Sequence, residues 1–583
     1  MNNVFRALKI ISKYDIRYLI VKIFVALCNV ALSFLSINIT KQILDMLVDK
    51  QEFSLILACI LSLVFIKIFS MLQSLIVNNY YPKLNNKLTH KIQRKLLEYV
   101  SKTDYAMFDD QTFYNKMEDA SKEIPKLIKV FDCFIEIITN TISLVVVVLT
   151  LIFYDWLALL LIIISIIPLS FIKAKINKHK FVSSKEQNSL SRKAFCIRHM
   201  LTSKYYAHEV RTFQTYGFLM EKYDDFHEQQ YKLTENINKK QASYSFLLSF
   251  TTLVIEIIAQ INLILKTIKG FFSIGDYSMI LSYVSKSVVC INGLMNSAFS
   301  LSETNRFLSN LFEFIDYAEE NINSNGNEKI KEGKHHTIEF KNVSFAYPNN
   351  ENKVLKNISF KLEPGSMTMI IGENGAGKST IIKLLCGFYK DYEGEIFIDD
   401  IELRNYDKNE LYKFMSIMFQ ELLVYPLSLE ENVSFSKQLK DEDYNDKPWF
   451  EEIVKKYPYG IETKILTHMY SNGVEPSGGE RQRIMLMRTL YKNDNYVYIF
   501  DEPTSSIDPK TEYQIYNSMK EYGKDKITIW ISHKLAHSYM ADQIINIVNG
   551  EIIEKGNHNE LINLNGEYSK LYKLQSERYV KNE

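Results

Sequence analysis

Long apolar runs fill the first 300 residues of this 583-residue chain, and the remaining residues contain none of that length. A helix needs about 20 mostly apolar residues to cross the hydrocarbon core of a bilayer. Six segments meet this requirement, at approximate limits of 18–40, 54–79, 129–153, 156–174, 245–267 and 271–299. Burial in a soluble core is a poor explanation for six such segments in so short a stretch. The pattern therefore predicts an all-α domain of six membrane-spanning helices.

Basic residues gather in two places, between the second and third predicted spans and between the fourth and fifth. Because lysine and arginine favour the cytoplasmic side of a membrane, both segments and both chain termini are predicted to face the cytoplasm. The two segments have a helical composition, so we expect the spans to continue into the cytoplasm as long helices. We expect no cleavable signal peptide, since the long apolar run after the basic N-terminus lacks a small-residue cleavage site.

Each cytoplasmic segment is interrupted once by an aromatic, turn-prone patch, at residues 105–114 and 209–217. Aromatic side chains at a turn far from the membrane suit docking into a partner. Ordinary packing between helices is an equally good explanation, and the sequence does not favour either one.

The pattern changes after residue 316, where a polar stretch rich in Asn, Glu and Lys extends to residue 336. This composition is typical of a linker. Strand-like alternation begins at residue 337. We therefore expect a transmembrane domain at 1–316, a linker at 317–336 and a soluble domain at 337–583.

Charge and cysteine content narrow the function classes. A net charge of +1 argues against nucleic acid as a partner held by a basic surface. The six cysteines show no metal-type spacing, so we interpret them as reduced, small apolar residues rather than a disulfide or zinc framework.

A phosphate-binding loop stands near the start of the soluble domain, in the form G-x-x-x-x-G-K-[ST]. An apolar strand is predicted at 367–371 and a helix from 381, which is the context that this motif requires. Backbone N–H groups of the loop and the helix N-terminus bind phosphate, Lys378 reaches the β- and γ-phosphates, and the hydroxyl of Ser379 binds Mg²⁺. The predicted ATP-binding residues are Gly372, Glu373, Asn374, Gly375, Ala376, Gly377, Lys378, Ser379 and Thr380.

Two acidic residues follow a second apolar strand at 496–500. Asp501 lies where a carboxylate can hold Mg²⁺ beside the phosphate loop, and Glu502 is a candidate general base for the attacking water. A solvated turn is the weaker alternative. Tyr347 precedes the loop and is a candidate for stacking on adenine, although a lone tyrosine there is more often an ordinary surface residue.

A second anion site is predicted at Ser477, Gly478, Gly479 and Glu480, which open another helix. An ordinary helix cap would also explain the serine. One nucleotide cannot fill both anion sites of a single domain unless the sites of two chains face each other, so the pair of sites points to a dimer.

These residues carry a resemblance to the ABC transporters. Residues 337–583 resemble the family's nucleotide-binding domain, with Ser477 to Glu480 similar to its signature. By this resemblance, Gln420 contacts Mg²⁺ and the attacking water, Asp508 belongs to the D-loop, and His533 is the switch histidine that contacts the γ-phosphate. With the six spans upstream, the whole chain resembles an exporter-type half-transporter: a six-helix membrane domain followed by an α/β P-loop domain. The two aromatic patches are similar to the family's coupling helices.

The chain departs from the family pattern directly before the signature, where Pro476 stands in place of the usual leucine. A proline lacks an N–H and restricts its neighbour, and the sequence leaves open whether this alters the signature geometry. The residues needed for hydrolysis are all present: Lys378, Gln420, Asp501, Glu502 and His533. We therefore expect a homodimer with two competent ATP sites, and a heterodimer with a related second half-transporter stays open.

The resemblance implies ATP hydrolysis that drives export of a peptide or an amphipathic small molecule across the cytoplasmic membrane by alternating access. A flippase for lipid or lipid-linked cargo is the nearest alternative, followed by an ATP-gated regulator or channel. Polar residues in the spans are candidates for contact with cargo or for pairing with one another, as Glu256 could with Lys286. They are Lys67, Asp132, Glu136, Glu256, Gln260 and Lys286.

Overall fold

A computed structural model describes residues 2–14, 16–109, 111–322, 326–333, 335–348, 350–436, 438–467, 469–492 and 494–580. The chain forms two compact units. The first contains Met1–Ser101 and Asn115–Ala318, and the second contains Lys102–Tyr114 and Glu319–Glu583. The short segment at 102–114, which includes most of the first aromatic patch, thus belongs to the same unit as the ATP-binding motifs.

The first unit is helical. Its elements are α1 (Asn2–Tyr14), α2 (Ile16–Val48), α3 (Phe53–Lys102), α4 (Gln111–Tyr154), α5 (Trp156–Thr202), α6 (Lys204–Thr212), α7 (Tyr216–Ile268) and α8 (Ile274–Ile322). The 50 residues of α3 correspond to about 75 Å of helix, well beyond the roughly 30 Å hydrocarbon core. The long helices therefore continue past the membrane, as the composition of the basic segments predicts.

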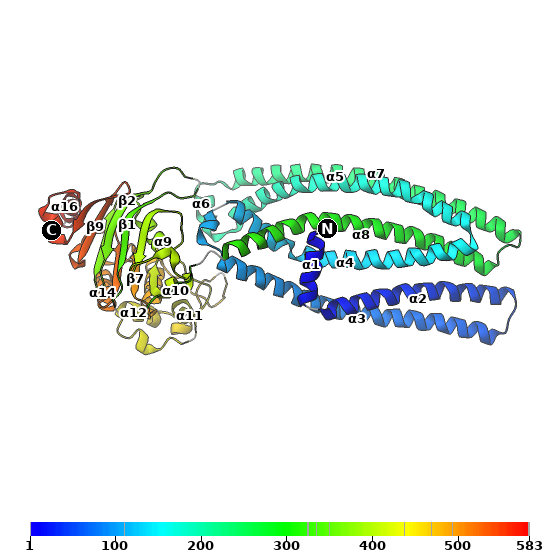
Figure 1. Ribbon diagram of the computed structural model, residues 1–583, viewed down its shortest axis with the longest axis horizontal. Coiled ribbons are helices and arrows are strands. Elements are labelled where there is room, and N and C mark those ends of the chain that lie inside the picture. The colour runs from blue at the N-terminus through cyan, green and yellow to red at the C-terminus, as the bar shows by residue number, and fades with distance from the viewer. Residues whose placement is uncertain are drawn as a thin grey trace. The chain divides into compact units, whose positions relative to one another are not determined.

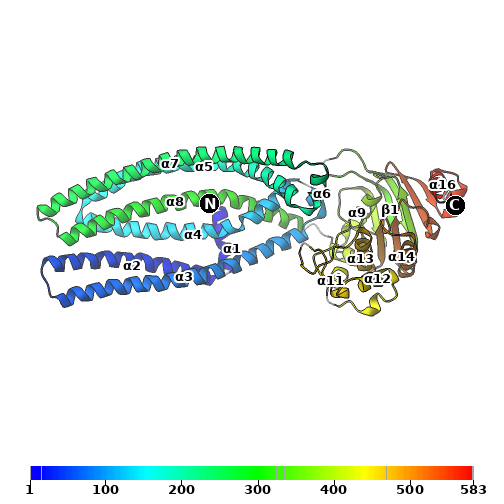
Figure 2. The same ribbon diagram turned by 180° about the vertical axis from the view of Figure 1, so that it is seen from behind.

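Within the described residues, five helices are long and apolar enough to cross a membrane. They comprise Ile20–Val48, Phe53–Lys102, Lys129–Tyr154, Tyr216–Ile268 and Ile274–Asn305. The remaining predicted span, 156–174, forms the start of α5, and several of its side chains lie outside the described residues. Figures 1 and 2 show α5 beside α7 and α2 beside α3.

The break between α4 and α5 is fixed by Asp155. Its carboxylate accepts hydrogen bonds from the backbone N–H groups of Leu157 and Ala158, which caps α5. The same buried carboxylate pairs with Lys266 of α7 at 2.9 Å and accepts from Asn262 at 3.1 Å. The hairpin of α4 and α5 is thus joined to α7 at its turn.

Three of the candidate cargo residues make contacts between helices. Asp132 of α4 pairs with Lys22 of α2. Glu136 accepts from Ser297 at 2.6 Å, and Lys286 donates to Ser33 at 3.1 Å. The suggested pairing of Glu256 with Lys286 is wrong, because Lys286 instead lies against α2.

The second unit contains two sheets. The first is antiparallel in the order β2-β1-β4-β5, with β1 (Ile338–Phe345), β2 (Leu355–Leu362), β4 (Glu393–Ile398) and β5 (Ile401–Glu402). The second has the order β10-β9-β3-β8-β7-β6, with β3 (Met367–Gly372), β6 (Met415–Met418), β7 (Val497–Asp501), β8 (Ile527–Ile531), β9 (Gln543–Val548) and β10 (Glu551–Gly556). All neighbours in this sheet are parallel except β9 and β10. The predicted fold class is confirmed.

Helices of the second unit surround the larger sheet (Figures 1 and 2). They are α9 (Lys378–Leu385), α10 (Lys408–Phe414), α11 (Leu429–Ser434), α12 (Pro448–Lys456), α13 (Gly478–Tyr491), α14 (Pro509–Tyr522), α15 (His558–Asn563) and α16 (Glu567–Val580). Short 3-10 turns are η1 (Tyr105–Asp109), η2 (Leu403–Asn405), η3 (Asp441–Asp443), η4 (Gly460–Glu462) and η5 (Ser538–Met540). Strands β7 and β8 are buried at every residue, which explains their continuous apolar sequences. In such sheets the ligand site forms at the carboxyl ends of the strands.

The first aromatic patch docks onto the ATP-binding domain of its own chain through η1. The ring of Tyr105 stacks on Phe388 with centroids 4.4 Å apart. The hydroxyl of Tyr389 donates to the carboxylate of Asp109, and Asp104 pairs with Lys408. Docking is therefore the better explanation for this patch, and the partner is the same chain.

The second aromatic patch belongs to the first unit, at the end of α6 and the turn that follows. Helix α6 begins before the predicted patch because Ser203 caps it, accepting from the N–H of Tyr205. The rings of Tyr205, Phe213 and Tyr216 are exposed in this chain. Docking of this patch stays a prediction.

Candidate nucleotide-binding site

The phosphate loop connects β3 to α9 through backbone conformations that require glycine. Gly372 has a φ of 150°, and a Cβ there would lie 2.2 Å from the carbonyl oxygen of Ile547. Gly377 has a φ of 102°, and its Cβ would lie 2.6 Å from the side chain of Leu355. A side chain at Gly372 would push the loop away from β9, and one at Gly377 would push it away from β2.

Lys378 lies inside the loop that precedes it. Its Nζ donates to the carbonyl oxygens of Gly372 at 2.9 Å and Glu373 at 2.8 Å. Burial lowers the pKa of its ammonium group, and the nearby carboxylates of Glu502 and Asp501 act in the opposite direction. The ammonium group is thus held where the loop would receive phosphate oxygens.

Two oxygen groups suited to Mg²⁺ lie together beside the loop. The hydroxyl of Ser379 donates to Asp501 at 2.8 Å. Burial raises the pKa of the Asp501 carboxyl despite this hydrogen bond, and the charge of Glu502 raises it further. A divalent cation would relieve this electrostatic cost, and hard oxygen ligands are those that Mg²⁺ prefers. The residues present therefore fit the metal.

The candidate general base and the switch histidine meet at the carboxyl ends of neighbouring strands. Asp501 at the end of β7 is paired in register with Ile531 at the end of β8, so the residues that follow are adjacent. Nδ1 of His533 lies 3.0 Å from Oε1 of Glu502. The carboxylate of Glu502 is mostly buried, whereas the histidine side chain is about half exposed (52%).

A pocket of about 470 Å³ brings these motifs together. Its lining contains Tyr347, Val354, Asn374, Gly375, Gly377, Lys378, Ser379, Thr380, Gln420 and Glu502. A larger pocket of about 830 Å³ in the same unit is lined by none of the phosphate-loop residues, so we assign the nucleotide to the smaller one. Residues up to 155 positions apart in the chain thus line one pocket. The sequence analysis predicts that these motifs bind the same ATP molecule.

Tyr347 is oriented by the phosphate loop and by a neighbouring aromatic ring. Its hydroxyl lies 3.0 Å from that of Thr380, and its ring meets Tyr389 edge to face at 5.4 Å. Tyr389 is also the residue that binds Asp109 of η1. The candidate adenine-stacking residue is therefore one aromatic contact away from the docked segment.

The predicted second anion site is a well-formed helix start. Ser477 caps α13 in a capping box, with Glu480 accepting from the Ser477 N–H at 2.8 Å. Lys456 donates to the same buried carboxylate at 2.6 Å. The ordinary cap is therefore confirmed, and the side chain of Glu480 points toward Ser477 and Lys456 of its own chain. The first N–H groups of α13, which no helix carbonyl can satisfy, stay oriented for an anion.

Pro476 leaves this geometry intact, which answers the question that the sequence left open. Ser477 has the extended backbone of a regular N-cap, with φ −64° and ψ 166°. The carbonyl of Pro476 accepts from Nε of Arg481 at 3.1 Å. Because the proline precedes the cap, its missing N–H is not needed by the helix.

Asp508 and Gln482 make contacts that the sequence analysis did not predict. The Asp508 carboxylate accepts from the N–H of Thr511 at 3.0 Å and caps α14, which lowers the pKa of this carboxyl. The sequence analysis assigns no role to Gln482, yet its buried side chain donates a hydrogen bond to the carbonyl of Glu502 at 2.8 Å. Its position four residues after Gly478, on the same face of α13, was the available signal.

A helical membrane unit joined to a P-loop α/β unit with a signature helix defines an ABC transporter. Residues 19–289 match the ABC transporter transmembrane region, and residues 355–505 match the ABC transporter family. The chain belongs to this family. Membership implies an ATP-binding domain that couples ATP hydrolysis to transport.

Particular relatives extend the similarity over nearly the whole chain. The subtilin transport ATP-binding protein SpaT of Bacillus subtilis is 30% identical over 94% of this chain and 90% of its own length. An ATP-dependent lipid A-core flippase of Wigglesworthia glossinidia brevipalpis is 26% identical over 96% of this chain and 95% of its own. The structure of a bacterial Atm1-family ABC exporter with ATP bound has a TM-score of 0.82 at 19% identity, covering 96% of this chain and 98% of that one, and it shows the shared fold.

Proposed function

We propose that this protein exports a peptide across the cytoplasmic membrane, driven by ATP hydrolysis in a dimer. The observation that carries the proposal is the pocket in which Lys378, Gln420 and Glu502 meet, with His533 hydrogen-bonded to Glu502. Binding alone would not require a carboxylate beside the γ-phosphate position. An ATP-gated channel could work without hydrolysis, so the intact pair favours a pump.

The geometry supports the following hydrolytic roles. Ser379, Gln420 and Asp501 would hold Mg²⁺, which neutralises phosphate charge when bound. Lys378 binds the β- and γ-phosphates. Glu502 accepts a proton from the attacking water while the water oxygen bonds to the γ-phosphorus and ADP leaves. His533 contacts the γ-phosphate and, through its bond to Glu502, orients the carboxylate.

The dimer supplies the second half of each ATP site. Ser477, Gly478 and Gly479 at the start of α13 would bind the nucleotide held by the phosphate loop of a second copy. A homodimer is favoured because this chain contains every hydrolytic residue together with a regular signature helix. Closure of the two ATP-binding domains then moves the cytoplasmic helices and turns the membrane cavity outward, and hydrolysis resets it.

A peptide is the favoured cargo because the subtilin transport protein is the relative with the higher identity over nearly the full chain. The similarity to a lipid A-core flippase supports a lipid or lipid-linked cargo as the second candidate. Three of the candidate cargo residues already have partners on other helices: Asp132 pairs with Lys22, Glu136 with Ser297 and Lys286 with Ser33. Lys67, Glu256 and Gln260 are thus the stronger candidates for cargo contact.

The test is ATPase activity and cargo transport by the purified chain in lipid vesicles. We expect hydrolysis that a cationic amphipathic peptide stimulates, none in Lys378→Ala, and an ATP-bound closed dimer in Glu502→Gln. Native hydrolysis by Glu502→Gln would refute the assignment of the base. Stimulation by lipid-linked cargo but not by peptide would favour the flippase, and an inactive pure chain that a second half-transporter activates would show a heterodimer.

A further inference from the structure

The backbone of Glu502 is held in an uncommon conformation. Its φ of 53° lies in the left-handed region, which a non-glycine residue keeps only when its surroundings fix it. The N–H of Glu502 donates to the carbonyl of Ile531 at 3.0 Å. Its own carbonyl accepts from Nε2 of Gln482 at 2.8 Å. The candidate base is therefore fixed on one side by strand β8 and on the other by a side chain of α13.

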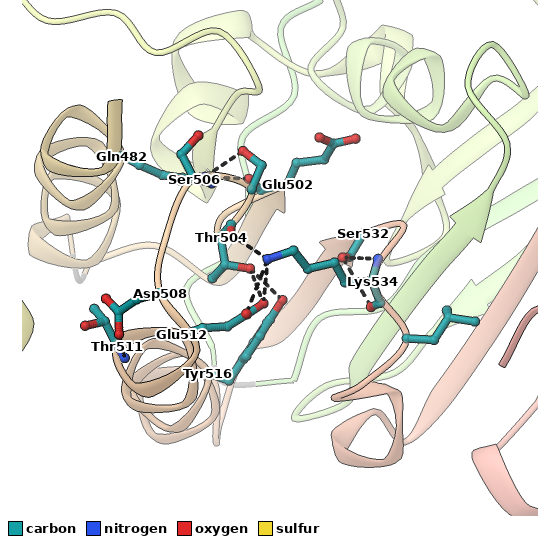
Figure 3. Close-up of polar contacts among 12 residues, drawn as sticks. Gln482, Glu502, Thr504, Ser506, Asp508, Thr511, Glu512, Tyr516, Ser532 and Lys534 are labelled. Atoms are coloured by element: carbon teal, nitrogen blue, oxygen red, sulfur yellow. Dashed lines mark hydrogen bonds and ion pairs between the residues drawn. The ribbon is translucent and has the colours of Figure 1, made fainter. Parts of the chain in front are cut away.

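Gln482 uses both ends of its amide on the turn that follows β7. Nε2 also donates to Oγ of Ser505 at 3.2 Å, and Oε1 accepts from the N–H of Ser506 at 3.0 Å. The residue is fully buried, with 0% of its surface exposed. Figure 3 shows the side chain reaching from its helix to the turn between Glu502 and Ser506. A buried amide with this set of partners specifies one arrangement of helix α13 and the turn that follows β7.

The same turn packs against the first residues of α13. A Cβ on Gly479 would lie 2.9 Å from the carbonyl oxygen of Ser506, and one on Gly478 would lie 3.9 Å from the Ser506 side chain. These glycines belong to the predicted anion site. The loop from Glu502 to Ser506 thus contacts the first helical turn of α13 at Gly478 and Gly479. It contacts the next helical turn of α13 through Gln482.

The other side of the turn is joined to the strand end that carries the switch histidine. Nζ of Lys534, the residue after His533, donates to the carbonyl of Thr504 at 3.0 Å and pairs with Glu512 at 3.3 Å. The hydroxyl of Thr504 donates to Glu512 at 2.8 Å, and Figure 3 shows this second cluster below the turn. With this side anchored, a shift of α13 would act on the turn mainly through Gln482.

We propose that Gln482 is a positioning residue that orients Glu502 and makes this orientation depend on helix α13. The inference rests on the proposed function, in which α13 binds the nucleotide of the opposite site and Glu502 acts in its own. Nucleotide bound against the signature of one chain is then sensed by the base of that same chain. The two ATP sites of the dimer are coupled through this amide.

The experiment compares the full-length chain in lipid with Gln482→Glu and Gln482→Met. The glutamate keeps the size and the acceptor for Ser506 but places an oxygen against the carbonyl of Glu502. We expect kcat to fall about tenfold in both variants, the effect of one lost positioning hydrogen bond, while KM and the Kd for ATP change less than about twofold. The Hill coefficient for ATP falls toward one, because the sites lose their coupling.

Asn495→Asp is the matched control. Asn495 is a buried amide just before β7 that donates to the carbonyl of Val497 at 2.6 Å, so the substitution removes the same kind of bond from the opposite end of that strand. It should lower thermal stability and leave kcat and the Hill coefficient unchanged.

The outcomes separate the two hypotheses. A native kcat in Gln482→Glu beside an active wild type would overturn this inference alone, and so would an equal loss of kcat in Asn495→Asp. Parallel losses of kcat and ATP affinity would also overturn it, since they indicate a damaged fold. A wild-type chain that binds ATP without hydrolysing it would overturn the proposed function and this inference together.

Discussion

Docking of η1 onto the ATP-binding domain should depend on the hydroxyl of Tyr389. This tyrosine is only 3% exposed, and burial raises its pKa, as does the carboxylate of Asp109 to which it donates. Tyr389→Phe removes that bond but keeps the ring, which contacts Phe345 at 5.2 Å and Tyr347 at 5.4 Å. The substitution therefore changes one interaction and creates no cavity.

The magnitude follows from the exposure of the acceptor. A hydrogen bond to a charged group contributes about 1.5–3 kcal/mol. Asp109 is exposed and regains water when the bond is lost, so we expect the low end, about 1.5 kcal/mol. Because 1.4 kcal/mol is a factor of ten, the undocked population of η1 should rise about tenfold.

Hydrogen exchange measures this population directly. The N–H of Met107 in η1 donates to the carbonyl of Asp104, the residue just before η1, and its exchange in the full-length chain should accelerate about tenfold in Tyr389→Phe. Tyr406→Phe is the control, since it removes a similar buried hydroxyl, bonded to the carbonyl of Ile398 at 2.9 Å, from the same unit. Equal acceleration of η1 exchange in both variants would refute the reasoning, as would additive effects of Tyr389→Phe and Asp109→Asn.

Three further predictions concern stability and binding. Gly372→Ala should weaken ATP binding at least about tenfold in a titration, because its Cβ meets the carbonyl of Ile547, whereas Gly217→Ala, which has open space, should not. Burial alone would raise the pKa of Glu480, but Lys456 and Ser477 hold it below its usual value. The resulting stability is present at neutral pH and is lost as pH falls from about 4.5 through the lowered pKa of Glu480, so Lys456→Met should lower Tm at pH 7 and have a smaller effect at pH 4. With Lys456 about two-thirds exposed (68%), the loss should be about 1 kcal/mol, and an equal Tm shift at both pH values would contradict it. Asp155→Ala should destabilise the membrane unit by about 2–4 kcal/mol in thermal unfolding in detergent, because it removes the α5 cap and leaves Lys266 unpaired. Adding Lys266→Met should recover part of this loss.

The fold and much of the nucleotide pocket could be predicted because their signals are local. The phosphate loop is one contiguous motif between an apolar strand and a helix, and β7 is a continuous apolar run that ends in Asp501. The limits of segments with mixed composition were harder to predict. Helix α8 continues to Ile322, into the predicted linker, because the polar residues of its last turns resemble loop residues. At Asp508, the carboxylate followed by a proline at the first helical position is a local N-cap signal, and the structure shows that cap.

The links between sites could not be predicted in the same way, because their partners are backbone groups or residues far away in the chain. Gln482 binds the carbonyl of Glu502 and the N–H of Ser506, and any sequence at those positions presents the same groups. Tyr389 and Asp109 are 280 residues apart. Motif chemistry locates the groups that touch nucleotide, whereas the residues that orient them are recognised by burial together with complete hydrogen bonding. Gln482 meets both criteria, which is why it, rather than a surface residue of the signature helix, is the one to test for coupling.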